Sequence, residues 1–269
     1  MRNSPGPDGP VSPAPHSSMV TRSDPSWERP SAVLFDLDGT LYDQRILRKA
    51  MLRELARAPF SKGPFAALRI AKVLRAFRLL REDLRGDQGS EAVLAKLQYE
   101  RPAAELDVSV EKVESIVTEW MYEKPLRHMA KAAWPGLRES LAQLRDAGLS
   151  LGVFSDYPPA AKLEALGVAD LFEVALGATD SGVNAFKPNP KGFVAGARAL
   201  GAAAKDVVYV GDRHDVDGAG AAAAEMRCVV LETGLGHVGA SGESTVAVSP
   251  GQHRSITSFS EVPRAVGIA

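Results

Sequence analysis

The chain has little cysteine, few aromatic residues and no long apolar run. Its 269 residues include a single cysteine, Cys228, so no disulfide can form within the chain. No apolar stretch approaches the roughly 18–20 residues that a membrane-spanning helix needs. Aromatic residues make up only 6% of the chain, so leucine, valine and alanine must build most of the core. These absences argue against a disulfide-stabilised scaffold, and because a lone thiol suits a reducing compartment, we expect a cytoplasmic location.

The chain also lacks an excess of charge of either sign. Its 32 basic and 33 acidic residues give a formal net charge of −1, so nothing draws the whole protein to nucleic acid or anionic lipid. We therefore expect no nucleic-acid partner. The charge is unevenly distributed, however, because residues 45–85 hold twelve lysines and arginines against three acidic residues, a local charge of +9.

Within this basic segment, one stretch has a regular pattern. Five basic residues recur at every third position: Arg69, Lys72, Arg75, Arg78 and Arg81. Interleaved apolar residues such as Leu68, Leu74 and Phe77 make the pattern typical of an amphipathic helix with a solvated basic face. The functional alternatives are attraction of an anionic substrate, or contact with a membrane surface or an acidic partner.

The first residues form a segment of different composition. Residues 1–30 hold seven prolines and six serines but no continuous apolar stretch. A secretory signal needs such a stretch, so this segment does not resemble one. It cannot bury enough apolar surface to offset its chain entropy, and we predict a disordered tail.

The rest of the chain alternates between strand and helix patterns. Short apolar segments predict buried strands at residues 32–36, 149–155, 172–176, 206–211 and 228–231. Between them, amphipathic patterns predict helices at residues 136–147, 158–166 and 190–200, each followed by glycine. This alternation predicts an α/β fold with a parallel sheet covered by helices. A short final element is expected within residues 255–266.

Residues 44–132 interrupt the alternation, since they show helical patterns and no strand pattern. We predict an all-helical insertion over this range. The core would then comprise residues 31–43 and 133–269.

Carboxylates follow the first predicted strand. Asp36 and Asp38 are separated by one residue, and Gly39 loosens the turn after them. Two carboxylates that converge on one point repel each other unless a cation lies between them. Mg²⁺ suits such an oxygen site. The structural alternative is an Asp-Gly turn with no chemical role.

More carboxylates follow the fourth predicted strand. Asp212, Asp215 and Asp217 lie after Gly211, where parallel strands place their ligands. The structural alternative is an acidic loop in which Asp217 caps the next helix. His214 lies in the same loop, but hard Mg²⁺ prefers oxygen, so we expect a surface histidine. Cys228, in an apolar strand, is expected to be a buried and inert thiol.

Two further residues could meet a phosphate group. Ser155 ends the second predicted strand, where a hydroxyl can hydrogen-bond a phosphate oxygen. Lys187, before Pro188 and a predicted helix, offers a compact positive charge. A helix-capping serine and a solvated lysine are the structural alternatives.

In chain order, these motifs resemble those of the haloacid dehalogenase-like hydrolase superfamily. Residues 36–40 match its Asp-x-Asp-Gly-Thr motif, Ser155 its Ser/Thr motif and Lys187 its lysine motif. Gly211, Asp212 and Asp217 match its Gly-Asp-x-x-x-x-Asp motif. The resemblance covers about residues 31–231 and is closest to phosphoglycolate phosphatases. It implies a Rossmann-like core and gives the helical insertion the position of a type-one cap.

The resemblance also implies roles for the first two aspartates. Asp36 would be the nucleophile, which forms an aspartyl-phosphate, and also a metal ligand. Asp38 would protonate the leaving oxygen and then activate water, while its backbone carbonyl binds the metal. A carboxylate nucleophile splits one difficult displacement into two easier steps, which agrees with these roles.

For the remaining residues the resemblance implies metal and phosphoryl contacts. Asp212 would bind Mg²⁺, with Asp217 supporting the metal site and Asp215 as the alternative support. Ser155 and Lys187 would hold the phosphoryl group and stabilise its charge.

The expected function is a magnesium-dependent phosphatase that hydrolyses a small phosphorylated metabolite. A phosphomutase and a non-catalytic binding protein on the same fold are the alternatives, whereas Asp38 opposes a dehalogenase. One departure from the family pattern is Asp156, where many relatives have asparagine. An acid at this position should repel phosphate unless its side chain points away.

Overall fold

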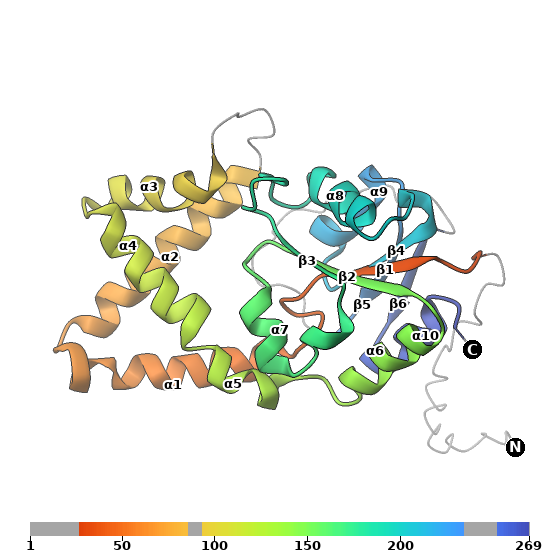
Figure 1. The fold of residues 1–269 in the computed structure, drawn as a ribbon. Helices are drawn as coiled ribbons and strands as arrows, with labels where there is room; N and C mark the ends of the chain where they lie inside the picture. Colours follow the sequence, from red (N-terminus) through yellow and green to blue (C-terminus); the bar gives the residue numbers. More distant parts are fainter. Residues whose placement is uncertain (1–26, 86–92, 234–251, 269) are drawn as a thin grey trace, which may run out of the picture.

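One six-stranded sheet forms the centre of the larger part of the molecule (Figure 1). The computed structural model describes residues 27–85, 93–233 and 252–268. All strand pairs are parallel, in the order β3-β2-β1-β4-β5-β6. The strands are β1 Ala32–Phe35, β2 Ser150–Ser155, β3 Val174–Gly177, β4 Val207–Gly211, β5 Arg227–Leu231 and β6 His253–Ile256.

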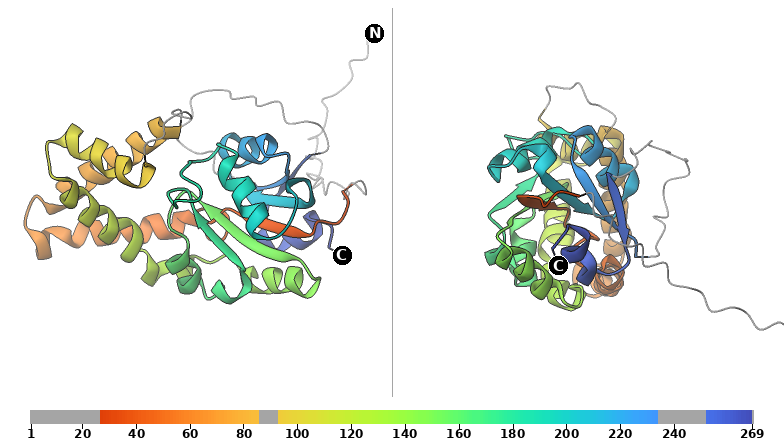
Figure 2. Two further views of the ribbon diagram at one scale, coloured as in Figure 1. Left: turned by 45° about the horizontal axis from the view of Figure 1, so that its top comes forward. Right: turned by 90° about the vertical axis from the view of Figure 1, so that its right-hand side faces the viewer.

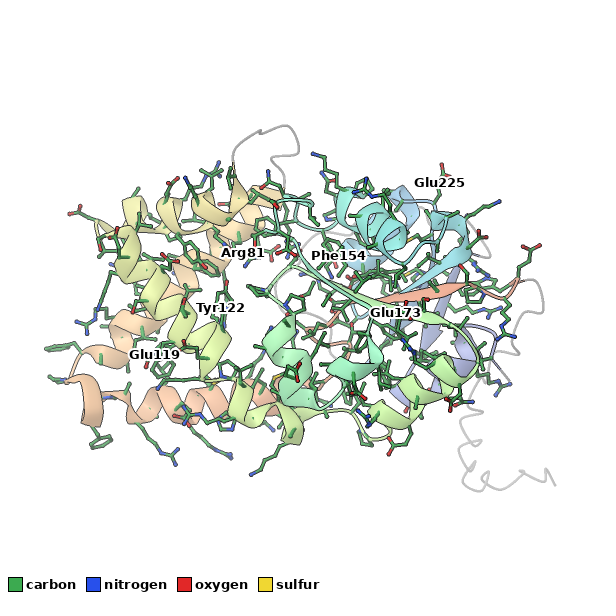
Figure 3. All side chains as sticks on the ribbon, viewed as in Figure 1. Arg81, Glu119, Tyr122, Phe154, Glu173 and Glu225 are labelled. Carbon is green, nitrogen blue, oxygen red and sulfur yellow. The ribbon has the colours of Figure 1, made fainter. Side chains whose placement is uncertain are left out.

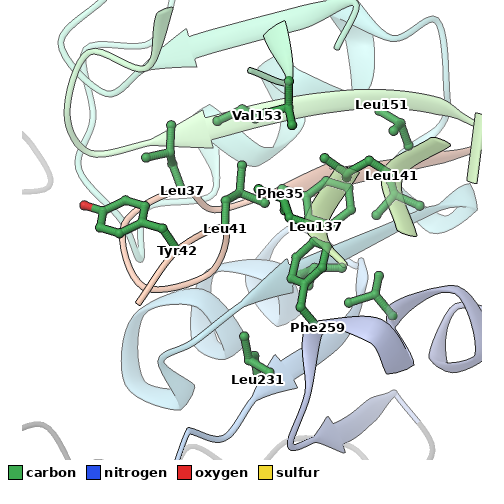
Figure 4. Packing of buried hydrophobic residues seen from close by; sticks show 14 of the residues in the cluster. Phe35, Leu37, Leu41, Tyr42, Leu137, Leu141, Leu151, Val153, Leu231 and Phe259 are labelled. Atoms are coloured by element: carbon green, nitrogen blue, oxygen red, sulfur yellow. The ribbon is translucent and has the colours of Figure 1, made fainter. Parts of the chain in front are cut away.

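Helices cover both faces of this sheet, and we call the sheet with these helices the core. They are α6 Leu137–Asp146, α7 Ala160–Leu166, α8 Lys191–Ala199, α9 Ala219–Ala223 and α10 Val262–Ala265. On one face, Phe35 and Leu151 of the sheet pack with Leu141 of α6 and with Phe259 (Figure 4). On the other face, Leu34 and Tyr209 pack with Phe193 of α8. Because both faces are covered, β1 and β4 consist of buried residues throughout, which explains their uninterrupted apolar sequences.

The structure confirms the predicted α/β fold. Each of the five predicted strands overlaps an observed one, and the three predicted helices correspond to α6, α7 and α8. The sixth strand, β6, was missed because its sequence His-Arg-Ser-Ile buries only Ile256 and gives no apolar run. The predicted final element within residues 255–266 contains the end of β6 and all of α10.

Between β1 and β2, the chain forms a separate group of helices, which we call the cap. They are α1 Gln44–Lys62, α2 Ala66–Arg85, α3 Leu94–Leu106, α4 Val110–Val117 and α5 Leu126–Ala132, with a π-helical turn at Thr118–Glu123. The cap extends from one end of the core (Figure 2). Its two connections meet there, since Tyr42 and Ala133 form an isolated antiparallel bridge. Within the described residues of this segment there is no strand, as the sequence predicts.

Helix α2 carries the five regularly spaced basic residues, which we call the basic stripe. Its burial differs from the sequence prediction at two residues. Its buried face includes Ile70, Val73 and Phe77, and the Phe77 ring stacks on Tyr99 of α3 at 5.7 Å. Leu68, expected among the packed apolar residues, is 71% exposed. Four stripe residues are exposed as predicted, namely Arg69, Lys72, Arg75 and Arg78. The fifth, Arg81, is buried, so the prediction of a wholly solvated basic face is wrong at this residue.

Other predictions concern the chain's first residues and its relation to membranes. Most of the predicted disordered tail, residues 1–26, lies outside the described residues. Trp27, near its end, packs against the core, with the Arg254 guanidinium 4.0 Å from its ring centre. None of the helices in the described ranges is both long and apolar enough to cross a membrane.

Candidate active site

The candidate site lies where β1, β2 and β4 end. The chain runs outward from β1 through β2 to β3 and then returns to place β4 on the other side of β1. Ligands in open α/β sheets bind at such a reversal, outside the carboxyl ends of the strands. Asp36 follows β1, Ser155 ends β2 and Asp212 follows β4, so the topology brings the predicted residues to one edge.

Asp36 has hydrogen-bond partners at its backbone N–H and at both carboxylate oxygens. Its backbone N–H donates to the Val210 carbonyl at 2.8 Å, which continues the pairing of β1 with β4. Lys187 Nζ lies 2.5 Å from one carboxylate oxygen, and the Thr40 hydroxyl donates to the other at 3.0 Å. Burial raises the pKa of Asp36 to about 7; Lys187 opposes this shift and the neighbouring Asp217 adds to it. The carboxylate is thus oriented, and a nearby cation would favour its ionised form.

Three carboxylates converge at this point. Oxygens of Asp36, Asp212 and Asp217 all lie within 4.8 Å of one another. Burial raises the pKa of Asp212 well above its ordinary value, and repulsion from Asp36 and Asp217 raises it further. A cluster of hard oxygen donors that cannot readily ionise together is the donor set that Mg²⁺ fits.

Gly39 makes this approach possible. It has a φ of +109°, and a β-carbon there would lie 2.2 Å from a carboxylate oxygen of Asp212. Any side chain at residue 39 would therefore displace Asp212 and strain the backbone. The glycine of the Asp-x-Asp-Gly motif is required by a contact with a residue that lies far along the sequence.

The two candidates for supporting the metal site lie in different surroundings. Asp217 is buried, and one of its oxygens accepts hydrogen bonds from the backbone N–H groups of Asp212 at 3.1 Å and Arg213 at 3.0 Å. Its other oxygen lies 2.7 Å from Lys187 Nζ. Asp215 instead pairs with Arg213 at 2.6 Å and is partly exposed. The geometry therefore favours Asp217, through its hold on the Asp212 loop, over Asp215.

Two other residues of this region are placed as the sequence predicts. His214 is exposed and its ring lies 3.2 Å from the Glu232 carboxylate, outside the carboxylate cluster. Cys228 is buried, and burial raises the pKa of its thiol well above the ordinary range. A thiol of this kind is unreactive.

Asp38 faces a different group of side chains from Asp36. One of its oxygens accepts hydrogen bonds from Tyr42 and Lys162, and the other accepts one from Ser155 at 3.3 Å. Burial alone would raise the pKa of Asp38, but Lys162 and Tyr42 outweigh burial and leave this pKa below its ordinary value. Its backbone carbonyl accepts a hydrogen bond from the Gln44 amide. Two aspartates one residue apart thus have opposite pKa shifts, because burial dominates at Asp36 whereas Lys162 and Tyr42 dominate at Asp38.

Lys187 is buried among the groups that it was expected to meet. Its ammonium lies 2.5 Å from Asp36, 2.7 Å from Asp217 and 3.1 Å from the Tyr209 hydroxyl. Burial alone would lower the pKa of Lys187, but Asp217 and Asp36 raise it well above the ordinary value. The lysine therefore stays charged, so it can stabilise negative charge at Asp36 and on a group bound there.

Asp156 does not face the site, which explains why an acid is tolerated there. Its carboxylate pairs with Arg85 of α2 at 2.6 Å and accepts the backbone N–H of Lys187 at 3.1 Å. Burial alone would raise the pKa of Asp156, but Arg85, Lys187 and Arg81 together lower it. The side chain points toward the cap and binds the segment that carries the site lysine.

Arg81 and Arg85 connect the cap to this part of the core. Arg81 donates to the Asp156 carbonyl at 2.6 Å and lies 4.1 Å from the ring centre of Tyr157, where α2 faces the core (Figure 3). Arg85 also donates to the Lys187 carbonyl at 2.5 Å. Two cap arginines thus contact the backbone on both sides of the site, through Asp156 and Lys187.

The sequence did not point to several residues that complete the site. Thr40 and Tyr42, beside the first motif, could have been found from that proximity. Lys162, Arg81 and Arg85 come from helices whose spacing to the aspartates carries no signal. Their core partners are between 71 and 124 positions away, so only the folded chain brings them together.

A cavity of about 480 Å³ opens beside Asp38. Its lining comes from both parts of the molecule, with Asp38, Tyr157 and Lys162 from the core and side chains of α1, α2 and the turn at Thr118–Glu123 from the cap. The cavity therefore lies between core and cap, and Asp38 is the candidate-site carboxylate in its lining.

Comparison with known proteins shows the family of this chain. Residues 30–225 match the family model described as haloacid dehalogenase-like hydrolase. The chain is 32% identical over 209 residues to the glyceraldehyde 3-phosphate phosphatase of Methanopyrus kandleri, covering 76% of this chain and 84% of that protein. It is 28% identical over 217 residues to the phosphoglycolate phosphatase of Pseudomonas savastanoi pv. phaseolicola, covering 77% of this chain and 71% of that one.

Solved structures share the fold. A HAD phosphatase from Thermococcus onnurineus has a TM-score of 0.55 at 25% identity, covering 88% of this chain and 98% of that one. An L-2-haloacid dehalogenase from Xanthobacter autotrophicus has a TM-score of 0.61 at 20% identity, covering 89% of this chain and 100% of that one. The second likeness concerns the fold alone, since related folds host different reactions.

Proposed function

Because the chain belongs to the haloacid dehalogenase-like hydrolase family, we propose that it is a magnesium-dependent phosphatase that acts through an aspartyl-phosphate on Asp36. The substrate class is a small phosphorylated metabolite, as the names of both phosphatase relatives suggest. The observation that carries the proposal is the position of Asp36, between the Lys187 ammonium at 2.5 Å and two further clustered carboxylates. The cap is proposed to comprise residues 44–132, and the core residues 31–43 and 133–269.

In the first proposed step, a carboxylate oxygen of Asp36 attacks the phosphorus atom. The bond from phosphorus to the ester oxygen breaks, and the departing oxygen takes a proton from Asp38. Asp38 has a lowered pKa in the free site, but a phosphate that arrives beside it adds negative charge and raises this pKa, which favours proton uptake. Lys187 offsets the charge that passes from the ester to Asp36.

In the second step, Asp38 takes a proton from water, and the water oxygen attacks the phosphorus of the aspartyl-phosphate. The bond from phosphorus to the Asp36 oxygen breaks, which restores the carboxylate and releases inorganic phosphate. Tyr42 and Lys162 orient Asp38 for both transfers, because they hold one of its oxygens and leave the other toward Ser155. One residue thus serves as acid and then as base.

The oxygen cluster fits Mg²⁺, which would supply positive charge to the transferring phosphoryl group. Asp36, Asp212 and the Asp38 carbonyl would hold the ion, with Asp217 fixing the loop that carries Asp212. The Asp38 carbonyl would exchange its hydrogen bond from Gln44 for the cation. Ser155 and Lys187 would bind the phosphoryl oxygens.

The same features bear on the alternatives. A proton donor at Asp38 suits an oxygen leaving group and opposes a dehalogenase. The network of paired charges around Asp36 and Lys187 supports catalysis over a purely binding role, since such groups are costly to bury without a purpose at the site. A phosphomutase would use the same nucleophile but return the phosphoryl group to a sugar hydroxyl.

The test uses para-nitrophenyl phosphate and purified protein, with and without Mg²⁺. We expect phosphate release with Mg²⁺, and in acid-quenched samples a phosphate on Asp36 by mass spectrometry. Phosphate release with the covalent phosphoryl group found on another residue would contradict the assignment of Asp36 as the nucleophile. A net transfer of phosphate to a second hydroxyl of a sugar phosphate, without release, would favour the mutase.

A further inference from the structure

The cavity beside Asp38 is large and mainly apolar. Its volume is about 480 Å³, within the range of about 300–1,000 Å³ that holds ligands of drug size. Side chains of α1 contribute Met51 and Leu55, α2 contributes Leu74, and the following turn contributes Trp120 and Met121. Contact between most of this wall and apolar ligand atoms would therefore be favourable, whereas the wall offers few hydrogen-bond partners to a polyol or a short acid.

The charged residues in the lining mostly have partners already. Arg48 donates to Gln44 at 2.5 Å, and Glu82 pairs with Arg85 at 2.7 Å. Arg78, an exposed cation of the basic stripe, has no acceptor among the described residues. The polar groups that can bind a ligand are thus concentrated near Asp38 and Arg78. The apolar wall can contact the body of the ligand.

The mechanism decides which part of the substrate enters this cavity. Asp38 lines the cavity and is the residue proposed to protonate the departing oxygen, so the alcohol of the ester must extend from this oxygen into the cavity. The transferring phosphoryl group lies on the other side, toward Asp36 and Lys187. The cavity is therefore the leaving-group pocket.

We propose that the substrate is a phosphate monoester whose alcohol carries a bulky, mainly apolar body. This inference rests on the proposed phosphatase function and deepens it. It also separates this chain from substrates as small as glycolate or glyceraldehyde phosphate, which would leave most of the cavity unfilled and most of its apolar wall in contact with water. Burial of the apolar body against α1 and α2 then supplies the binding energy that selects the substrate.

The experiment compares ethyl, butyl and hexyl phosphate, in which the leaving alcohols differ in length but hardly in acidity. With Mg²⁺ present, kcat/KM should rise by about fourfold per added methylene until the cavity is filled. 2-Phosphoglycolate should be hydrolysed less efficiently than hexyl phosphate. A flat series, or a clear preference for 2-phosphoglycolate, would overturn the proposed substrate class while leaving the phosphatase function intact.

Variants of the cavity lining test whether the cavity determines the selectivity for longer alkyl phosphates. Leu74→Trp and Leu55→Trp narrow it from two different helices, and either should lower the ratio of kcat/KM for hexyl over ethyl phosphate by tenfold or more. Leu68→Trp, on α2 but 71% exposed and outside the lining, is the matched control and should leave this ratio unchanged. Circular dichroism and thermal melting identify a variant that has failed to fold. In that case the variant on the other helix provides the test. An unchanged ratio in both folded variants would contradict the assignment of the cavity.

A binding measurement separates this inference from the phosphatase function. Calorimetry with Asp36→Asn and non-hydrolysable ethyl-, butyl- and hexylphosphonate should show affinity rising with chain length. If no ester, including para-nitrophenyl phosphate, is hydrolysed by the wild type, the phosphatase function fails, and the substrate class fails with it. Rising phosphonate affinity in that case would still support an apolar ligand cavity and would leave only the reaction to be reassigned.

Discussion

The core keeps the charges of the candidate site buried and paired, whereas the cap carries most of its charge on the surface. Asp36, Lys187 and Asp217 are nearly inaccessible and contact one another, while Arg69 and Arg75 of the cap are exposed. Buried charges are costly unless each has fixed partners, so the core is organised before a substrate arrives. Exposed charges cost little and act at longer range. The difference suggests that the core performs the chemistry and that the cap selects and attracts what reaches it.

Among the described residues, two cap cations break this division. Arg81 and Arg85 leave the pattern of exposed charge and reach the core backbone at Asp156 and Lys187. The comparison can therefore be tested at three levels, namely the buried core groups, the contact between the two parts, and the exposed stripe.

The largest expected effect lies in the core. Asp36→Asn should lower kcat by about 10³-fold or more, because an amide cannot accept the phosphoryl group. The fold should be retained, since asparagine has the same shape and Lys187 keeps Asp217 as a partner. Steady-state kinetics and circular dichroism measure both effects.

Asp215→Asn is the matched control, because Asp215 lies in the acidic loop but pairs with Arg213 at the surface. Its activity should stay within a few-fold of the wild type. Activity of the Asp36 variant within tenfold of the wild type would reject Asp36 as the nucleophile.

Removal of metal should have an effect of similar size. Dialysis against EDTA should abolish phosphate release, and Mg²⁺ should restore it, because the clustered oxygens of Asp36, Asp212 and Asp217 offer a site for a hard cation. Asp212→Asn should raise the Mg²⁺ concentration needed for half-maximal activity, whereas Asp215→Asn should not. Full activity of a protein in which elemental analysis finds no metal would disprove the metal requirement.

The contact between cap and core predicts an effect on stability. Asp156→Asn should lower the free energy of unfolding at neutral pH by about 3 kcal/mol, because it leaves the mostly buried guanidinium of Arg85 without its buried ionic partner and with only the exposed Glu82 as a charged partner. Glu82→Gln removes the exposed partner of the same arginine and should cost less than about 1 kcal/mol. Denaturant titration measures the two values, and equal costs would contradict the distinction between buried and exposed pairs.

The same variant has a predicted pH dependence. The pKa of Asp156 is lowered in the folded protein, where Arg85 and its neighbours outweigh burial. Its stabilising contribution is therefore fully present above the unfolded pKa of about 3.9 and is lost as the pH falls through the lower folded pKa. The difference between wild type and Asp156→Asn should be largest near neutral pH and should close below about pH 4. A difference that grew on acidification would have the wrong sign.

The smallest effect is expected from the exposed stripe. Replacing Arg69, Lys72 and Arg75 by glutamine should lower kcat/KM at low salt by about tenfold at most and flatten its salt dependence, while kcat stays nearly unchanged. The reason is that surface charge steers an anionic substrate but does not enter the chemical step. The measurement requires a substrate whose capture limits kcat/KM.

The control is a triple replacement of three exposed core residues, Arg198, Lys205 and Arg264. It removes the same amount of positive charge as the stripe variant, but at positions far from the stripe in the sequence. Equal effects of the two triple variants would mean that total charge matters and its location on the cap does not. Loss of binding to anionic lipid vesicles in the cap variant alone would favour a membrane-surface role for the stripe over steering.

The sequence by itself determined much of the fold and the kinds of residue at the site. Mainly apolar runs predict buried strands, and each of the five such runs overlaps an observed strand. In β1 and β4 every residue is buried, so burial acts directly on local composition, whereas the edge strand β3 buries only Gly177 and does not fit the prediction of a buried strand. The order of strands and helices then places Asp36, Ser155 and Asp212 at one edge, since the carboxyl ends of parallel strands meet there. The strand β6 was missed since it is an edge strand that buries only Ile256 and so leaves little trace in its composition.

Only the tertiary structure decided which charges meet. A period of three along α2 cannot show that Arg69 remains in solvent while Arg81 enters the contact with Tyr157 and Phe186, because this depends on where α2 faces the core. For the same reason, Asp156 looked like an obstacle to phosphate in the sequence and is a partner of Arg85 in the fold. The cavity beside Asp38 likewise is formed by side chains from two separate parts of the chain. Local patterns record which side of an element is buried, but they carry no information about the distant residue that it is buried against.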